Sequence, residues 1–477
     1  MQQLTGLDAA FLGMETPTVH GHAGSVCLLD PSSAPEPLTV ARLATLVESR
    51  LHLIPAFRRR LVSVPFGLDH PYWVEATDLD LDFHVRELTL PKPGDDLQLR
   101  EQVADIHARH LDRTRPLWEL YLIHGLRDRL AVYLKVHHAA IDGVSGNDLM
   151  AALMDVTPDG CEIGPPAPVT PDRVPGSVEL LVRSAASLAT HPARLARTGY
   201  GLVRAAPSLA ARHQLVRAQQ VVGHEADVEL PATRRLRAPS TPFNGPVTAG
   251  RRWTYRSLSL DTVRSIKQAH GTTVNDVVLA LCAGALREWL REQDALPQAP
   301  LVAAVPVSVR TPDDADHVGN RISIMMAPIP THLDDPAARL RTVHGSMGAA
   351  KELHGLLPAN LLADVAQFTM PAVVGRAARL SARLRLLEKA TPFNLIISNV
   401  PGPQLPLYYG GARLLAYYPV SAVTDGQGLN VTVISYDGHM DFGIIADREL
   451  VPDLERIGDL LEKELEILAA TNPPLEP

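Results

Sequence analysis

Two adjacent histidines, followed closely by an aspartate and a glycine, are the residues of this chain best suited to chemistry. Three residues separate His137 and His138 from Asp142 and Gly143. An imidazole with an unperturbed pKa of about 6.5 can accept a proton from an alcohol, amine or thiol near neutral pH. A base positioned in this way contributes roughly 10²- to 10⁴-fold in rate. We therefore predict a catalytic set in which His138 is the general base, His137 lies beside it, and Asp142 fixes the loop and the imidazole.

A strand is predicted to position these histidines. Residues 130–136 alternate between apolar and other side chains, a period of two that is typical of a strand with one buried face. Continuing the alternation places His138 on the apolar face and His137 on the face of Tyr133 and Lys135. The Asp-Gly pair predicts a turn, and a helical pattern follows it. The structural alternative is a satisfied core histidine ahead of a plain turn.

The spacing His-His-x-x-x-Asp-Gly resembles the HHxxxDG signature of the acyltransferases related to chloramphenicol acetyltransferase. That superfamily includes nonribosomal peptide condensation domains, plant alcohol acyltransferases and the bacterial wax ester synthase/diacylglycerol acyltransferases. Further stretches resemble the last family and follow its order along the chain: residues 7–12 (LDAAFL), 115–119 (RPLWE), 274–277 (VNDV), 306–310 (PVSVR), 398–403 (SNVPGP) and 425–430 (DGQGLN). The signature resembles the superfamily, and the whole set resembles this one family.

The resemblance implies an α/β fold with two chloramphenicol acetyltransferase-like domains, each a mixed sheet flanked by helices. It implies a tunnel between the domains, which acyl-CoA enters from one face and the acceptor from the other. His138 would then take the proton of the acceptor hydroxyl. The backbone around Gly143 and the side chain of Asn275 are candidate oxyanion donors, and Asp276 is a candidate substrate-binding neighbour. The mechanism needs no metal and no cofactor, since acyl-CoA is a co-substrate.

Length and composition are consistent with a two-domain protein. The chain has 477 residues, a length that exceeds the usual size of a single core, and 46% of its residues are hydrophobic. We predict a first domain over 1–160, a Pro-rich and basic amphipathic helical linker over 161–243, and a second domain over 244–477. The net charge of −8 gives no reason to expect a nucleic acid partner. The three cysteines lie far apart, which indicates a reducing compartment without a disulfide framework.

The sequence predicts a cytoplasmic protein that can contact a membrane from its surface. No signal peptide and no run of about 20 apolar residues is visible. Residues 177–222 form a basic amphipathic segment, and residues 375–389 form a second, shorter stretch with several arginines. Such a segment is either a helical crossover with its arginines in water or a surface that lies on anionic lipid at the inner membrane or a lipid droplet.

Three local patterns carry further expectations. Residues 273–290 predict a helix in which Thr273 and Asp276 form a capping box, so that Asn275 and Asp276 lie at its positive end. His20 and His22 alternate near the start, and we favour loop or strand packing of residues 7–24 over a metal site. Residues 441–443 spell the kinase letters DFG, but no other kinase motif accompanies them.

The predicted activity is transfer of a long-chain acyl group from acyl-CoA to diacylglycerol, or to a fatty alcohol to give a wax ester. Diacylglycerol ranks first because the resemblance to the family implies it, and no residue of this chain selects the acceptor. A condensation-type enzyme with a carrier-bound donor and an amine acceptor is one alternative, and a non-catalytic lipid-surface protein with this fold is another. A metal hydrolase using His137, His138 and Asp142 is a distant third, because adjacent strand residues point to opposite faces.

Overall fold

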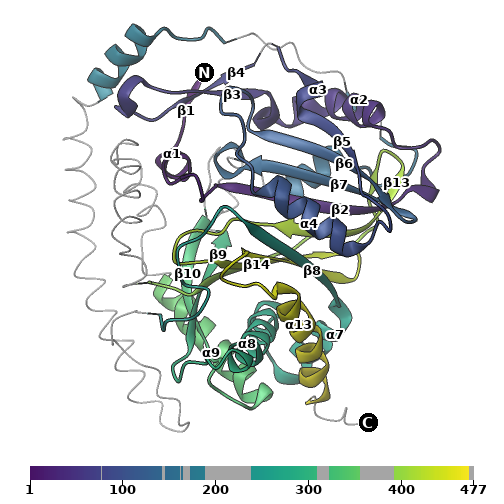
Figure 1. The fold of residues 1–477 in the computed structure, drawn as a ribbon, viewed down its shortest axis with the longest axis vertical. Helices are drawn as coiled ribbons and strands as arrows, with labels where there is room; N and C mark the ends of the chain where they lie inside the picture. Colours follow the sequence, from purple (N-terminus) through teal and green to yellow (C-terminus); the bar gives the residue numbers. More distant parts are fainter. Residues whose placement is uncertain are drawn as a thin grey trace.

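The computed structural model describes residues 1–76, 78–141, 146–161, 163–164, 172–187, 238–308, 322–354 and 391–471. These residues form two halves, each a six-stranded sheet with helices on its outer side, stacked one above the other (Figure 1). Both sheets combine parallel and antiparallel neighbours, so the predicted α/β class with mixed sheets is confirmed. Within the described residues, no helix is both long enough and apolar enough to cross a bilayer.

The first sheet has the strand order β12-β13-β2-β7-β6-β5. Its strands are β2 (His22–Asp30), β5 (Val85–Thr89), β6 (Trp118–Leu126), β7 (Arg129–His137), β12 (Tyr408–Tyr409) and β13 (Ala412–Val420). The pairs are antiparallel except for β5 and β6. β7 lies inside the sheet between β2 and β6, and the strand predicted for the histidine signature is confirmed.

The second sheet has the strand order β10-β9-β11-β14-β15-β8. Its strands are β8 (Arg251–Ser259), β9 (Leu301–Ser308), β10 (Ile322–Ile329), β11 (Leu395–Val400), β14 (Leu429–Tyr436) and β15 (His439–Asp447). A third, three-stranded sheet lies at the edge of the first half and contains β1 (Gln2–Gln3), β3 (Arg59–Val62) and β4 (Tyr72–Glu75) in the order β1-β4-β3.

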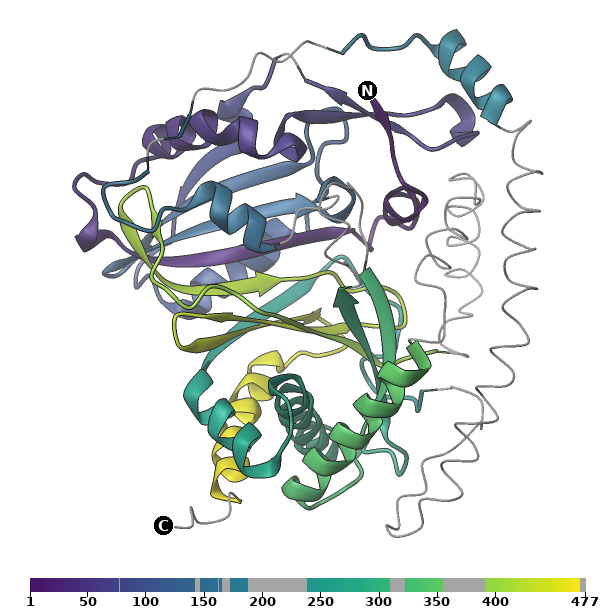
Figure 2. The same ribbon diagram turned by 180° about the vertical axis from the view of Figure 1, so that it is seen from behind.

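Helices cover the outer faces of both sheets (Figure 2). The first half carries α1 (Gly6–Gly13), α2 (Val40–Arg50), α3 (Leu81–His84) and α5 (Gly146–Leu153), whereas α4 (Asp96–His107) packs between the first sheet and β8 of the second. The second half carries α7 (Leu260–His270), α8 (Val274–Glu292), α9 (Pro336–His354) and α13 (Leu454–Ala470). Short 3₁₀ helices η1 to η5 span Pro31–Ser33, Leu51–Leu53, Pro55–Arg58, Pro65–Gly67 and His138–Ala140.

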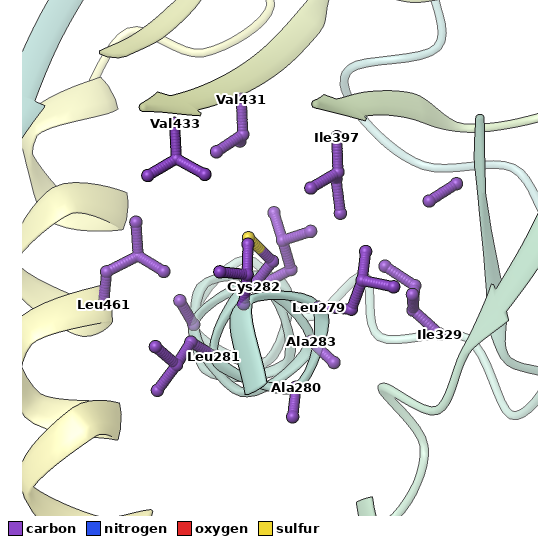
Figure 3. Packing of buried hydrophobic residues seen from close by; sticks show 14 of the residues in the cluster. Leu279, Ala280, Leu281, Cys282, Ala283, Ile329, Ile397, Val431, Val433 and Leu461 are labelled. Carbon is purple, nitrogen blue, oxygen red and sulfur yellow. The ribbon is translucent and has the colours of Figure 1, made fainter. Parts of the chain in front are cut away.

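Helix α8 forms the centre of the second core. It is buried on nearly all sides, as expected of a helix that is apolar all round. Figure 3 shows Cys282 pointing toward Val431 and Val433 of β14, with Leu461 of α13 at one flank of the helix. The burial of Cys282 raises the pKa of its thiol to about 12, so it is the inert core residue that its apolar helical surroundings suggest.

The second half contributes two strands, β12 and β13, to the first sheet, so the fold does not divide simply at residue 244. Residues 408–420 fall in the predicted second domain, yet β13 pairs with the edge strand β2 of the first sheet, with Tyr417 opposite Cys27. The unpaired edge of β2 needs a partner to satisfy its backbone groups, and the returning chain supplies it. Most of the predicted linker 161–243 lies outside the described residues, as does 375–389. Residues 177–187 of the linker are helical.

Two local predictions are wrong. β7 is buried on both faces rather than one, because α4 and the second sheet cover the face of Ala131, Tyr133 and Lys135. The stretch 7–24, expected to be loop or strand, contains most of helix α1, whose N-cap Thr5 accepts a hydrogen bond from the backbone N–H of Asp8.

Glycine 443 allows the sheets to approach closely. A Cβ atom there would lie 1.8 Å from the carbonyl oxygen of Pro419, which also accepts a hydrogen bond from Trp253 Nε1. The letters DFG therefore have a packing role. Because backbone cannot move aside as a flexible side chain can, we expect Gly443→Ala to cost about 3 kcal/mol or more, measured as a lower thermal midpoint. Gly345→Ala is the matched control, since open space surrounds Gly345 on α9; it should leave the midpoint unchanged or raise it slightly.

Candidate active site

The histidine pair lies where β7 ends. His137 is the last residue of the strand, opposite His22 of β2, and its backbone N–H donates to the carbonyl of Leu117 at 2.9 Å. The chain then turns into η5, and the backbone N–H of His138 donates to Gly21 at 2.7 Å. The strand stops one residue earlier than the alternation predicts, yet the ring of His138 stacks on Phe11, which packs on the same core cluster as Leu134 and Val136 of the apolar face of β7. The placement of His137 on the face of Tyr133 and Lys135 is confirmed.

The hydrogen bonds of His137 define its tautomer. Its Nδ1 accepts from the backbone N–H of Ala139 at 3.1 Å, so this nitrogen carries a lone pair. A neutral ring must then carry its proton on Nε2, which lies 3.0 Å from Oε1 of Glu15 and donates to it. His137 thereby caps the 3₁₀ turn on one side and is held by a carboxylate on the other. It orients the main chain of its neighbour and has no free nitrogen with which to act as a base.

Glu15 is held as a carboxylate. Burial raises the pKa of this group, but the hydrogen bonds from His137 and Arg113, with that of the Gly21 N–H, outweigh burial and bring the pKa to about 2. The packing around Gly21 is tight as well: a Cβ atom there would lie 3.0 Å from Nε2 of His137. Glu15, Gly21 and Arg113, all distant from His137 in the sequence, thus fix one imidazole.

His138 has the properties of a free base. Its ring stacks on Phe11 of α1, with the centroids 4.8 Å apart and the planes 15° from parallel. Burial, followed by the neighbouring His137, lowers the pKa of His138 to about 4, so the ring is neutral at pH 7. Its buried Nδ1 has no hydrogen-bond partner on any other residue that the structure describes. A neutral, partly exposed imidazole of this kind can accept a proton from a bound hydroxyl.

The other predicted site residues are not all found at this place. Asp142 and Gly143 lie outside the described residues, and α5 begins shortly after them. Asp276 is 1% exposed and its carboxylate is engaged within the second half: Oδ2 accepts from Thr273 N at 2.9 Å and from His344 Nδ1 at 2.7 Å. The predicted capping box is therefore confirmed. Asn275, next to it, makes no side-chain hydrogen bond with the described residues.

A cluster of buried cationic and imidazole groups lies beside the pair, between the two sheets. The Nζ of Lys135 donates to the carbonyls of Ile106 and Arg109 at the C-terminal end of α4, where the helix dipole favours a positive charge. Burial, and then the charge of Lys135, lowers the pKa values of both His22 and His107 well below 6.5. These histidines are neutral at physiological pH, and their packing is that of a core rather than of a charged pocket.

This cluster predicts a loss of stability in acid. The pKa of His20 is lowered to about 4, first by burial and then by His110, and neither ring nitrogen of His20 has a partner among the described residues. A histidine whose pKa is lower when folded binds its proton only on unfolding, so stability declines as pH falls below about 6.5 and continues to decline toward 4. Each such group contributes about 1.4 kcal/mol per pH unit in this window. Asp441 has the opposite effect on stability. Burial raises its pKa to about 6, so the folded state binds this proton more readily and gains stability as pH falls below about 6.

We therefore expect the thermal midpoint to fall steeply between pH 7 and 5. His20→Leu removes one titrating group without breaking a described hydrogen bond, so its midpoint should fall less over the same range. The measurement is differential scanning fluorimetry at constant ionic strength, with Ile467→Ser as an exposed control on α13. An identical pH profile for His20→Leu and the parent protein would show that folding does not lower the pKa of His20.

Sequence reasoning missed Glu15, Arg113, Gly21 and Phe11 as parts of the site. Phe11 lies in a quoted family stretch, but its ring contact with His138 depends on how α1 packs beside η5. Glu15 and His137 are 122 positions apart, and no local pattern connects them. The pairing of β2 with β7 brings Gly21 and Glu15 to the histidines, so a correct strand order would have been the available signal.

Family models match most of the chain. The wax ester synthase/diacylglycerol acyltransferase catalytic domain matches residues 4–278, and the WS/DGAT C-terminal domain matches residues 318–469. The first match includes the histidine pair and the α1 segment that packs on it.

Individual relatives match over nearly the whole length. A probable diacylglycerol O-acyltransferase of Mycobacterium tuberculosis is 38% identical over 97% of each chain, and O-acyltransferase WSD of Acinetobacter baylyi is 33% identical over 98% of this chain and 97% of that one. The structure of the wax ester synthase/diacylglycerol acyltransferase from Marinobacter aquaeolei has a TM-score of 0.70 and 32% identity, and the match covers 99% of this chain and 100% of that one. The first condensation domain of the calcium-dependent antibiotic synthetase shares the fold, with a TM-score of 0.55 and 16% identity over 99% and 97% of the two chains. By its histidine signature, its two-sheet fold and these matches, the chain belongs to the wax ester synthase/diacylglycerol acyltransferase family.

Proposed function

We propose that this protein transfers a long-chain acyl group from acyl-CoA to diacylglycerol, giving triacylglycerol, and that fatty alcohols also serve as acceptors and give wax esters. The observation that carries the proposal is the neutral imidazole of His138, aimed from the end of β7 and supported by a carboxylate-bound His137. Relatives named for diacylglycerol acyl transfer match along nearly the whole chain and support this substrate class.

The proposed reaction requires one base and no covalent enzyme intermediate. His138 takes the proton of the acceptor hydroxyl, and the oxygen attacks the thioester carbonyl of acyl-CoA. The tetrahedral intermediate collapses with cleavage of the C–S bond, and the leaving thiolate of coenzyme A recovers the proton from His138. The buried cysteines Cys27 and Cys282 have thiol pKa values raised by burial, so neither is suited to carry the acyl group.

The oxyanion of the intermediate needs a preorganised donor, which is typically worth about 2.7 to 4 kcal/mol. The backbone around Gly143 and the side chain of Asn275 stay our candidates for this role, and Asp142 our candidate for holding the loop. The capping contacts of Asp276 indicate that it supports the end of α8 rather than the substrate. The variant Asn275→Ala, which retains Asp276, would separate the oxyanion role of Asn275 from the helix-capping role of Asp276.

The test is acceptor-dependent release of CoA from palmitoyl-CoA by the full chain in detergent micelles, with dioleoylglycerol or hexadecanol as acceptor. We expect release with dioleoylglycerol and weaker release with hexadecanol, and the corresponding ester in the lipid extract. Absence of release with both acceptors would contradict the proposal. Release with an amine acceptor alone would favour a condensation-type enzyme.

We further propose that the protein is cytoplasmic and acts in peripheral contact with a membrane or a lipid droplet. Its proposed substrates and products partition into lipid, so an enzyme outside the lipid phase must meet them at the surface. The basic amphipathic character of residues 177–222 supports this interpretation.

A further inference from the structure

A hairpin tip in the first half presents an aromatic side chain to solvent. Phe66 lies in η4, between β3 and β4, and its side chain is 83% exposed. Its φ of 60° is in the left-handed region, which is uncommon for a bulky residue. Burying a phenyl ring normally contributes about 1.5–3 kcal/mol. Phe66 forgoes this contribution, because its ring is exposed to water.

A helix beside this hairpin is apolar on its solvent side. Leu180 of the helix over residues 177–187 packs on Val64 and Tyr72 of the hairpin, and the two segments lie side by side in both views (Figures 1 and 2). Val178 and Val182, one helical turn apart, are 75% and 64% exposed. A helix in water normally shows polar groups on this side, so two strongly exposed valines one turn apart are unusual on a surface helix.

Arginines lie on or next to the same two segments as these apolar side chains. Arg173 and Arg183 share one carboxylate, that of Glu179. Arg60 lies on β3 and has no carboxylate partner among the described residues. Arg173, Arg183 and the N-terminal amine outnumber the two carboxylates that they bind, those of Glu179 and Asp172.

We propose that Phe66, Val178 and Val182, with the arginines Arg60, Arg173 and Arg183, form a surface that docks on an anionic lipid bilayer. This inference rests on the proposed function for the purpose of docking, since a lipid acyltransferase must reach substrates in a membrane. The docking itself is tested independently of acyl transfer. The aromatic tip and the valine stripe enter the interface between headgroups and acyl chains, and the arginines contact the phosphates. The chemistry of the surface, with both apolar and cationic side chains, matches this partner rather than a neutral oil phase.

The first test places a fluorophore at the tip of the hairpin. The four native tryptophans, Trp73, Trp118, Trp253 and Trp289, are at most 4% exposed, so lipid-borne quenchers affect them little. In Phe66→Trp we expect blue-shifted emission with vesicles of 70% phosphatidylcholine and 30% phosphatidylglycerol, and quenching when the lipids carry bromine on their acyl chains. Ile467→Trp, on α13 at the far end of the molecule (Figure 1), should show neither change.

The second test measures partitioning of the full chain into the same vesicles by co-sedimentation. We expect Phe66→Ser to lower the partition coefficient at least about tenfold, and Val178→Ser with Val182→Ser to lower it similarly, whereas Ile467→Ser should leave it unchanged. Replacing Arg60, Arg173 and Arg183 together by glutamine should abolish the preference for anionic over neutral vesicles. In detergent micelles, CoA release by all of these variants should equal that of the parent protein.

Several results would overturn the proposal. Unchanged emission of Phe66→Trp with anionic vesicles would show that the tip does not enter the bilayer. Binding to triolein emulsions but not to anionic vesicles would assign the surface to a neutral droplet. A change of oligomeric state in Phe66→Ser, seen by light scattering without loss of vesicle binding, would assign it to a second copy of the chain. None of these readouts depends on acyl transfer, so failure of the proposed function would be seen separately, in the micelle assay.

Discussion

Replacing His138 by alanine is expected to lower kcat for acyl transfer by about 10²- to 10⁴-fold, the range that a positioned general base contributes. The substitution removes the nitrogen that accepts the acceptor's proton. KM for acyl-CoA should change little, because the proton moves only in the chemical step. The measurement is steady-state CoA release with dioleoylglycerol in micelles.

The fold should survive this substitution. The ring of His138 contributes stacking on Phe11 but no hydrogen bond to another described side chain, so the thermal midpoint should shift by only a few degrees. His20→Leu is a matched control, because it removes another buried imidazole from the same half without touching His138. Wild-type kcat in His138→Ala would mean that another group is the base, and equal losses in both variants would indicate general damage to the core.

Replacing Glu15 by alanine is expected to lower kcat by about 10²-fold although Glu15 does not touch the reacting atoms. Without the carboxylate, Nε2 of His137 loses its acceptor, the tautomer is no longer enforced and the turn that aims His138 loosens. A misplacement of about 1 Å at a catalytic group has an effect of this size. Glu15 is thus a positioning residue, and its loss should appear in kcat more than in KM.

Two comparison variants separate positioning from simple loss of an ion pair. Glu15→Gln keeps an oxygen that can accept from His137, so it should recover most of kcat. Arg113→Gln removes the half-exposed partner of Glu15 and leaves the bond to His137 intact, so we expect less than about a threefold effect. If Arg113→Gln were as inactive as Glu15→Ala, the ion pair and not the orientation of His137 would be the important feature.

Much of the local structure follows from the sequence. The alternation over residues 130–136 predicts β7 and the face on which His137 lies, and the Thr273–Asp276 spacing predicts the capping box that begins α8. The hairpin of β14 and β15, over Asp437 and Gly438, also follows from alternation with a turn pair. These features depend on residues within one element or turn, so the information for them is local.

The site is local only in part. The HHxxxDG spacing identifies His138 as the candidate base, and the family stretches define the superfamily fold before any contact is known. The structure adds a role next to that base. Because β7 ends at His137, this histidine caps the 3₁₀ turn η5 that carries His138. The structure also shows the carboxylate of Asp276, predicted to cap helix α8, bound to Thr273 and to His344.

The sequence by itself determined most of the elements, the family and the candidate general base, because each is encoded in short-range spacing. The tertiary structure decided which residues support that histidine. Glu15 and Gly21 reach His137 through the pairing of β2 with β7, and the second buried face of β7 exists because α4 and the second sheet cover it. β13 joins the first sheet from the far end of the chain. Strand order and sheet stacking depend on which distant surfaces bury one another, and no single segment carries that information.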